Sequence, residues 1–172
     1  LKKVVSIPSS NVTTFNRIFR QTPQLLEVPK LDLSSATNIT EMFYSATQIQ
    51  YLEPYDLDNE APNITSLVNT FHLVNNLINV PITSCSNITD FRAAFTGNKF
   101  TSFDLDCSAA TSVTNMFEDC TQMVSCTATF PNNLTSTGYM FDSCTSLKEI
   151  KPFNTINVTN AGTMFRSTYK LR

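Results

Sequence analysis

The stretch TSVTNMFEDCTQM, residues 111–123, recurs along the chain with small changes around a central phenylalanine. Seven such phenylalanines follow one another at intervals of 24, 28, 24, 22, 24 and 24 residues. They are Phe19, Phe43, Phe71, Phe95, Phe117, Phe141 and Phe165. Self-similarity at such a period is the signature of one supersecondary unit stacked on itself. The spacing therefore predicts a solenoid, an architecture that usually makes surfaces rather than catalytic clefts.

A helix-capping residue type stands five residues before each of these anchor phenylalanines. These residues are Thr14, Asn38, Ser66, Asp90, Ser112, Ser136 and Asn160. Apolar residues then recur at i, i+3, i+4 and i+7, as in Val113, Met116, Phe117 and Cys120. That spacing is one face of an element with a period of about 3.6 residues. A side-chain oxygen just before it can accept from the free N–H groups of the first helical turn. Each unit is therefore predicted to contain a short capped helix.

A threonine stands six residues before each anchor phenylalanine, without exception. The column is Thr13, Thr37, Thr65, Thr89, Thr111, Thr135 and Thr159. A buried hydroxyl without a partner costs roughly 1–3 kcal/mol, so a repeated threonine needs a repeated bond. We expect a ladder in which each threonine bonds to backbone or to the next threonine. The alternative is a β-branched turn residue exposed to water.

A leucine-like position follows the predicted helix, with another apolar residue three positions later and often a proline, as in LLEVP (25–29) and LINVP (77–81). Proline lacks an N–H for a central ladder and cannot continue a helix, so this segment is predicted to be a strand that pairs with its counterpart in the next unit. The predicted fold is an α/β leucine-rich-repeat solenoid of about seven 22–28-residue units, each a short capped helix plus a short strand. Residues 1–172 form one such domain. Because the chain starts inside a repeat and neither terminal unit has a polar cap, we expect it to be an excerpt of a longer protein.

The segments TSVTNMFEDCTQM (111–123) and TGYMFDSCTSLKEI (137–150) resemble the BspA-like leucine-rich repeats of bacterial surface proteins. The string Met-Phe-x-x-Cys-x-x-Leu-x-x-Ile is also similar to the related surface-lipoprotein repeats of mycoplasmas. The resemblance covers essentially the whole chain, although the copies at Phe19, Phe71 and Phe95 lack both the Met and the Cys. It implies a leucine-rich-repeat solenoid used in adhesion or recognition at cell surfaces, with no catalytic residues.

Composition favours an extracellular, cell-surface or virion-surface location. Charged residues make up only 15% of the chain and the net charge is −2, and Ser, Thr and Asn are abundant. A nucleic-acid partner would need clustered Lys and Arg, which the sequence does not have. We find no run long and apolar enough to span a membrane, so direct membrane insertion of this segment is not expected.

The predicted function is a non-catalytic, surface-exposed binding or adhesion module that recognises protein or glycan. A stacked sheet would display variable side chains, and an insertion stretches the repeat between Phe43 and Phe71 to 28 residues. Candidate contacts are Glu27, Gln50, Tyr51, Tyr55, Asn79, Ser102, Ser125, Lys148 and Glu149. The alternative is a structural or docking element of a larger assembly, such as a viral or phage spike, tail or capsid appendage, with sister subunits as partners.

Five cysteines, an odd number, exclude complete pairing within the chain: Cys85, Cys107, Cys120, Cys126 and Cys144. Cys120 and Cys144 hold the same repeat position, so a row of buried thiols is favoured over a disulfide between them. The cysteine spacing and the single histidine, His72, match no zinc site, and no other metal or cofactor is predicted. His72 itself is predicted to be a surface or satisfied side chain rather than a general base.

Six Asn-x-Thr sequons occur, at Asn11, Asn38, Asn63, Asn87, Asn133 and Asn157. They would be glycosylation sites on a eukaryotic secreted chain. Five of the six fall at one repeat position, so an asparagine ladder or Asx-turns explain them as well, and we favour this structural role.

Overall fold

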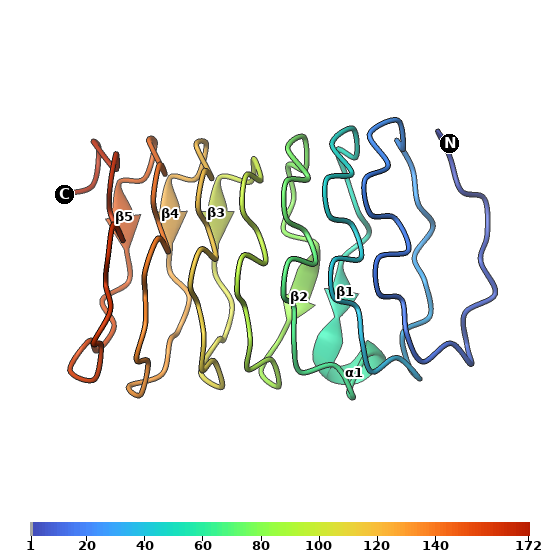
Figure 1. Ribbon diagram of the computed structural model, residues 1–172, viewed down its shortest axis with the longest axis horizontal. Helices are drawn as coiled ribbons and strands as arrows, with labels where there is room; N and C mark the ends of the chain where they lie inside the picture. Colours follow the sequence, from blue (N-terminus) through green and yellow to red (C-terminus); the bar gives the residue numbers. More distant parts are fainter. Residues whose placement is uncertain (1) are drawn as a thin grey trace.

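The computed structural model describes residues 2–172 as a row of parallel chain segments stacked side by side, with the two termini at opposite ends of the row (Figure 1). We call the segment around each anchor phenylalanine a rung, and number the rungs 1 to 7 from Phe19 to Phe165. The elements are β1 (Tyr55–Asp56), α1 (Leu57–Glu60), β2 (Ile82–Ser84), β3 (Ser102–Phe103), β4 (Ser125–Cys126) and β5 (Glu149–Ile150). β1 pairs in parallel with β2, and β3, β4 and β5 form a separate parallel sheet.

The predicted α/β leucine-rich-repeat solenoid with one capped helix in each unit is wrong. Within residues 2–172 the only helix is α1, four residues long, and it lies in the insertion rather than at a predicted helix position. Where the helices were expected, each rung has a left-handed residue two positions before the anchor phenylalanine and another two positions after it, for example Asn115 (φ 60°) and Asp119 (φ 58°) around Phe117. An L-residue in this region cannot continue a right-handed helix.

Hydrogen bonding explains how the chain does without helices. The N–H groups of the anchor phenylalanine and of the left-handed residues donate to carbonyls of the next rung. For Phe117, the N–H donates to the Met140 carbonyl at 3.0 Å. The residues between them donate to carbonyls three positions earlier in their own rung, as Met116 donates to Val113 at 3.1 Å. The alternation satisfies most backbone groups without the i to i−4 bonds of an α-helix. We call this half of each rung the turn side.

The core is a column of stacked phenylalanines. All six neighbouring pairs of anchor rings lie nearly parallel, with centroids 5.4–5.9 Å apart. Six of the seven rings are buried, and Phe165 in rung 7 is partly exposed. Such offset aromatic pairs contribute about 0.5–1.5 kcal/mol each beyond the area they bury. The repeat therefore places one large side chain per rung in a continuous interior.

The threonine ladder is confirmed at four of its six steps, and most of its members are exposed. The N–H and the hydroxyl of Thr89 both donate to the Thr65 carbonyl, at 2.8 and 3.2 Å. Thr111 makes the same two bonds to Thr89, at 2.7 and 3.0 Å. Thr37 bonds to Thr13 and Thr159 to Thr135 in the same way. The capping column beside it forms Asx-type turns instead of helix caps, as where Asp90 Oδ1 accepts from the Arg92 N–H at 3.1 Å.

The opposite half of each rung, which we call the strand side, is less regular. It comprises residues 26–30, 50–56, 78–84, 101–106, 124–129 and 148–151 in rungs 1 to 6. The predicted pairing of short strands occurs in rungs 4 to 6, where Ser102 pairs with Ser125 and Ser125 with Glu149. Between rungs 1 and 2, and between rungs 3 and 4, the strand sides of the described chain share no backbone hydrogen bond. These two interruptions separate the sheets and decide where a surface site can form.

Candidate binding site

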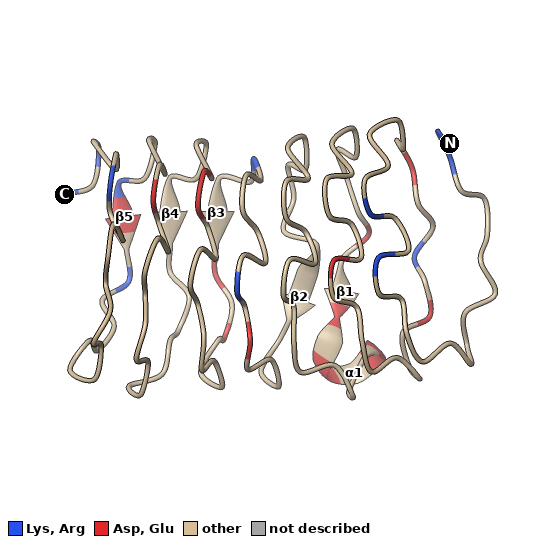
Figure 2. Cartoon of the chain, viewed as in Figure 1, with Lys and Arg blue, Asp and Glu red and all other residues tan. Residues whose placement is uncertain are grey.

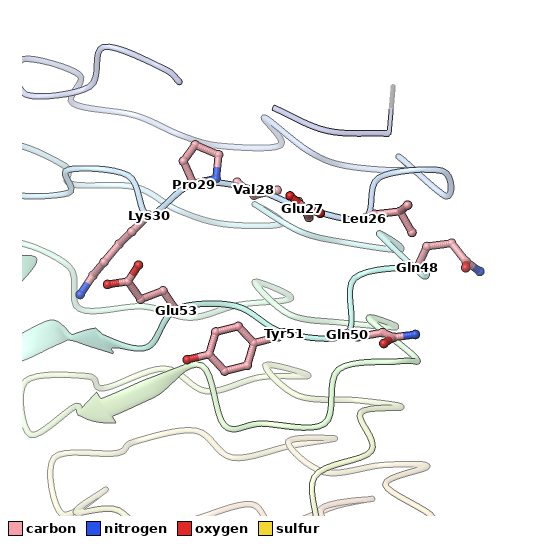
Figure 3. Close-up of a pocket in the computed structure, with 9 residues that line it drawn as sticks. All are labelled: Leu26, Glu27, Val28, Pro29, Lys30, Gln48, Gln50, Tyr51 and Glu53. Carbon is pink, nitrogen blue, oxygen red and sulfur yellow. The ribbon is translucent and has the colours of Figure 1, made fainter. Parts of the chain in front are cut away.

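A groove of about 520 Å³ lies between the strand sides of rungs 1 and 2 (Figure 3). One wall is the segment 26–30 and the other is contributed by residues 48–53. The lining residues are Leu26, Glu27, Val28, Pro29, Lys30, Gln48, Gln50, Tyr51 and Glu53. Pockets of about 300–1,000 Å³ are typical of ligand sites, so the groove is large enough to hold part of a partner molecule.

The groove exists because the strand side of rung 2 bonds to rung 3 and not to rung 1. The Ile78 N–H donates to the Gln50 carbonyl at 3.1 Å. The Asn79 amide accepts from the Leu52 N–H and donates to the Leu52 carbonyl, at 3.3 and 2.8 Å. Toward rung 1 the contacts are made by side chains instead, since the Leu31 N–H donates to the Tyr55 hydroxyl at 2.9 Å.

The turn sides of rungs 1 and 2 remain closed beneath this opening. The Phe19 N–H donates to the Met42 carbonyl at 2.9 Å, and the Gln21 N–H donates to the Tyr44 carbonyl at 2.7 Å. The two rungs are therefore joined along one side and parted along the other. The groove therefore lies at the parted side.

The walls combine apolar surface with a small negative charge. The Tyr51 side chain is 59% exposed and Leu26 is 46% exposed, so both offer apolar surface to a partner. Glu27 is paired with Lys3, and Lys30 with Glu60. Glu53 has no ion pair among residues 2–172. With the two paired charges neutralised, one carboxylate remains, and the groove suits a partner that brings both apolar surface and a cation.

The Lys30 side chain fixes one end of the groove. Its Nζ lies 2.7 Å from the Glu60 carboxylate and 5.3 Å from the centre of the Tyr55 ring. The Lys30 hydrogen bond is the largest cause that lowers the pKa of Glu60, and a backbone hydrogen bond from Asp56 adds to it. Lys30 is therefore held by groups of α1 and β1 and is not free to neutralise Glu53.

Three of the predicted contact residues come together here: Glu27, Gln50 and Tyr51 line the groove. Tyr55 is not a contact residue, because its side chain is 4% exposed and its hydroxyl accepts from Leu31. Burial raises the pKa of this phenol to about 12. Asn79 is half-buried and serves the backbone of rung 2, as described above.

The other predicted contacts lie along the strand sides of rungs 4 to 6, away from the groove. Ser102, Ser125 and Glu149 form one row across β3, β4 and β5. Lys148 is exposed and lines a second depression with Tyr169, Lys170 and Arg172. Sequence reasoning therefore identified the row of strand-side positions. It did not show that the groove forms at only one part of that row.

Several groove residues were missed by sequence reasoning: Leu26, Val28, Pro29, Lys30, Gln48 and Glu53. A signal for the groove was present in the 28-residue repeat, since the extra residues follow Phe43 and break the regular spacing next to this wall.

All five cysteines are free and buried, as predicted. The Cys120 and Cys144 thiols donate to the carbonyls of Phe95 and Phe117, at 3.2 and 3.1 Å. Burial raises the pKa of Cys126 and of Cys144 to about 12. These thiols are therefore packing groups rather than nucleophiles.

His72 was predicted to be a surface or satisfied side chain. Instead it is half-buried, stacks on Tyr44 with ring centres 4.7 Å apart, and has an Nδ1 that is buried without a hydrogen-bond partner among residues 2–172. Burial lowers its pKa. The six sequon asparagines are all exposed. Among them, Asn38 forms the expected Asx-turn to the Thr40 N–H at 2.9 Å, and Asn157 donates to the Asn132 carbonyl at 2.8 Å.

Charged side chains are spread along the stack, and most of the chain carries neither sign (Figure 2). In the described chain no helix has the length and apolar character that crossing a membrane requires. No group of three or more His, Cys, Asp or Glu side chains in residues 2–172 is arranged to hold a metal ion.

The described chain is thus a repeat protein made of short stacked units (Figure 1), with a groove on the strand side between rungs 1 and 2. The chain belongs to the family described as Mycoplasma protein of unknown function, DUF285, whose model matches residues 2–80 and again residues 63–172. Two overlapping matches are what a repeated sequence produces. We find no match among curated proteins or among solved structures.

Proposed function

We propose that this chain is a non-catalytic, surface-exposed binding module that recognises protein or glycan, and that the groove between rungs 1 and 2 is its recognition site. The observation that carries the proposal is an exposed tyrosine, Tyr51, that lines the groove together with Glu53, a carboxylate without an ion pair among residues 2–172. Aromatic side chains with one free face are typical anchors of recognition surfaces.

The proposed location is extracellular, at a cell surface or virion surface, and the relationship to BspA-like surface repeats belongs to the same proposal. The low charge and the exposed Ser, Thr and Asn residues support it. In such a protein the regular turn sides would hold the shape while the irregular strand sides meet the partner.

The test is binding of the fluorescently labelled 172-residue chain to host or neighbouring cells. We expect saturable binding that falls at least tenfold in the double variant Tyr51→Ala, Glu53→Lys. The matched control is Lys148→Glu, Glu149→Lys, which alters exposed residues of rung 6 and should bind as the unmodified chain does. Binding that survives the groove variant and is lost in the control would place recognition elsewhere. No saturable binding, even for a multimerised chain, would favour a structural role in a larger assembly.

A further inference from the structure

The groove walls carry backbone hydrogen-bonding groups whose counterparts in other rungs bond to the neighbouring rung. In rungs 5 and 6 the N–H of Lys148 donates to the Val124 carbonyl at 2.9 Å, and the N–H of Lys151 donates to the Cys126 carbonyl at 2.8 Å. The corresponding pairs in rungs 1 and 2 are Gln50 with Leu26 and Glu53 with Val28, counted from the anchor phenylalanines. Neither bond is made in the described chain.

Two walls of the groove therefore carry free backbone groups. On the rung 1 wall these are the Leu26 carbonyl and both backbone groups of Val28, and on the rung 2 wall the N–H groups of Gln50, Tyr51 and Glu53. Backbone N–H and C=O groups left unpaired at a sheet edge form a template for another strand. An extended segment that enters the groove can pair with them by β-augmentation, in which the main chain gives affinity and side-chain pockets give specificity.

The charge of the walls selects among such segments. Glu53 reaches from the rung 2 wall toward the end of the Lys30 side chain (Figure 3), but it forms no ion pair among residues 2–172. A Lys or Arg side chain on the incoming segment would pair with Glu53 and lie against the Tyr51 ring, an arrangement that favours cations. Side chains alternate along a strand, so the residues on either side of that cation would face away from Glu53. Apolar residues two positions from the cation would contact Leu26 and Val28.

The second interruption in the strand ladder differs from the groove. Where rungs 3 and 4 meet, the Lys99 N–H donates to the Leu77 carbonyl at 2.9 Å, so a backbone bond joins the two rungs just before their strand sides begin. Leu26 and Gln50, which begin the strand sides of rungs 1 and 2, make no such bond with each other in the described chain. The junction between rungs 1 and 2 is therefore the more open of the two.

We propose that the groove binds an extended peptide segment of about five residues, bearing one Lys or Arg between apolar residues, which pairs its backbone with Val28 and Tyr51 and its cation with Glu53. At about 3.3 Å per residue, five residues match the length of the wall formed by residues 26–30. This inference rests on the proposed function and narrows it from protein or glycan to an unfolded peptide segment of a protein partner.

The first experiment screens the fluorescently labelled 172-residue chain on an array of unstructured nonapeptides of varied sequence, beside a glycan array. We expect binding enriched in peptides with one Lys or Arg and apolar residues two positions before and after it. For the best peptide, Glu53→Gln should weaken binding at least tenfold and Tyr51→Ala by a similar factor. The matched control is Tyr139→Ala, which removes a partly exposed tyrosine from the turn side of rung 6 and should leave binding unchanged.

The second experiment tests the backbone pairing itself. Methylating the backbone nitrogens of the best peptide at alternate positions removes N–H donors and leaves the side chains, and we expect at least a tenfold loss of binding in one of the two methylation registers. Hydrogen exchange followed by NMR should show the Val28 or Tyr51 amide slowed at least tenfold by the unmethylated peptide. The Thr127 amide, already bonded to Phe103, serves as the unchanged reference.

Two results would overturn the inference. One is a best peptide whose binding is indifferent to methylation and slows neither amide. The other is enrichment of glycans instead of peptides, lost in Tyr51→Ala. Both leave the proposed binding function standing, because the labelled chain would still bind cells through the groove. If the cell-binding experiment fails instead, the proposed binding function is rejected. The two hypotheses can therefore be rejected separately.

Discussion

The two sides of every rung behave differently. On the turn side all seven rungs repeat the same left-handed pair of residues and the same bonds between rungs. On the strand side the bonds change from rung to rung, and two of the junctions lack them in the described chain. The comparison indicates that the turn-side bonds hold the repeats together, while the bonding of the strand side varies from rung to rung. Stability should therefore depend on turn-side residues, and recognition on strand-side residues.

The largest expected effect is on the phenylalanine column. Phe117→Ala should lower the free energy of unfolding by about 3–5 kcal/mol, because it opens a cavity between two stacked rings in the buried core. Chemical denaturation monitored by circular dichroism measures the change. The strand-side counterpart, Tyr51→Ala, should change it by less than about 0.5 kcal/mol because the side chain is mostly exposed. Equal losses in the two variants would contradict the division between the sides.

The threonine ladder should contribute a smaller amount. Thr89→Val removes a hydroxyl that donates to the Thr65 carbonyl while keeping the side-chain shape, and should cost about 0.5–1.5 kcal/mol of unfolding free energy. Thr101→Val is the matched control, since Thr101 is exposed and its hydroxyl makes no hydrogen bond in the described chain. A control that loses as much as Thr89→Val would show that the ladder is not the cause.

Glycine gives a sharper test of the left-handed positions. Ala93 has φ 50°, a conformation that costs an L-residue about 1–2 kcal/mol. Ala93→Gly removes that cost but raises the conformational entropy of the unfolded chain. We therefore expect a net gain of about 0.5–1 kcal/mol in the free energy of unfolding. Ala109 is not left-handed, so Ala109→Gly should lower the free energy of unfolding by about 0.5–1 kcal/mol. Opposite signs in the two thermal or chemical denaturation series are the expected result.

The smallest effect we expect is the pH dependence of the turn side. Burial lowers the pKa of His72 below its ordinary value of about 6.5, so the folded state favours the neutral imidazole. The contribution of His72 to stability is then present above pH 6.5 and is lost as the pH falls from 6.5 through the lowered folded-state pKa. His72→Gln should flatten the stability curve below about pH 6.5 relative to the unmodified chain. A variant with an unchanged slope would assign the pH dependence to carboxylates.

Much of the turn side could be predicted from the sequence. The period, the anchor phenylalanines, the threonine bonds and the buried thiols follow from columns of identical or similar residues. The helices were predicted wrongly because the apolar spacing of Val113, Met116, Phe117 and Cys120 also fits a chain of turns. Left-handed residues are usually marked by glycine. Here Gly97 is the only glycine among fourteen such positions, so the composition gives no warning.

The strand side was predicted less well, because its geometry depends on which bonds are absent. Column position was enough to select Glu27, Gln50 and Tyr51. Column position could not show that the Tyr55 side chain points inward. Its hydroxyl accepts a hydrogen bond from the backbone N–H of Leu31 in rung 1. The groove itself lies beside an inserted segment that breaks the repeat, and a pattern of repeats describes such departures poorly.

The turn-side bonds also give the stack an electrical direction. The Phe19 amide donates to the Met42 carbonyl, and the next amide along, that of Phe43, belongs to the same peptide group and donates to Thr70. The line continues in this way through Phe71, Phe95, Phe117 and Phe141, and two parallel lines run through the left-handed residues on either side. Peptide groups joined head to tail polarise one another and add their dipoles, as they do along a helix. A protein almost without helices thus carries three aligned rows of amides, whose positive poles face the direction in which the sequence runs.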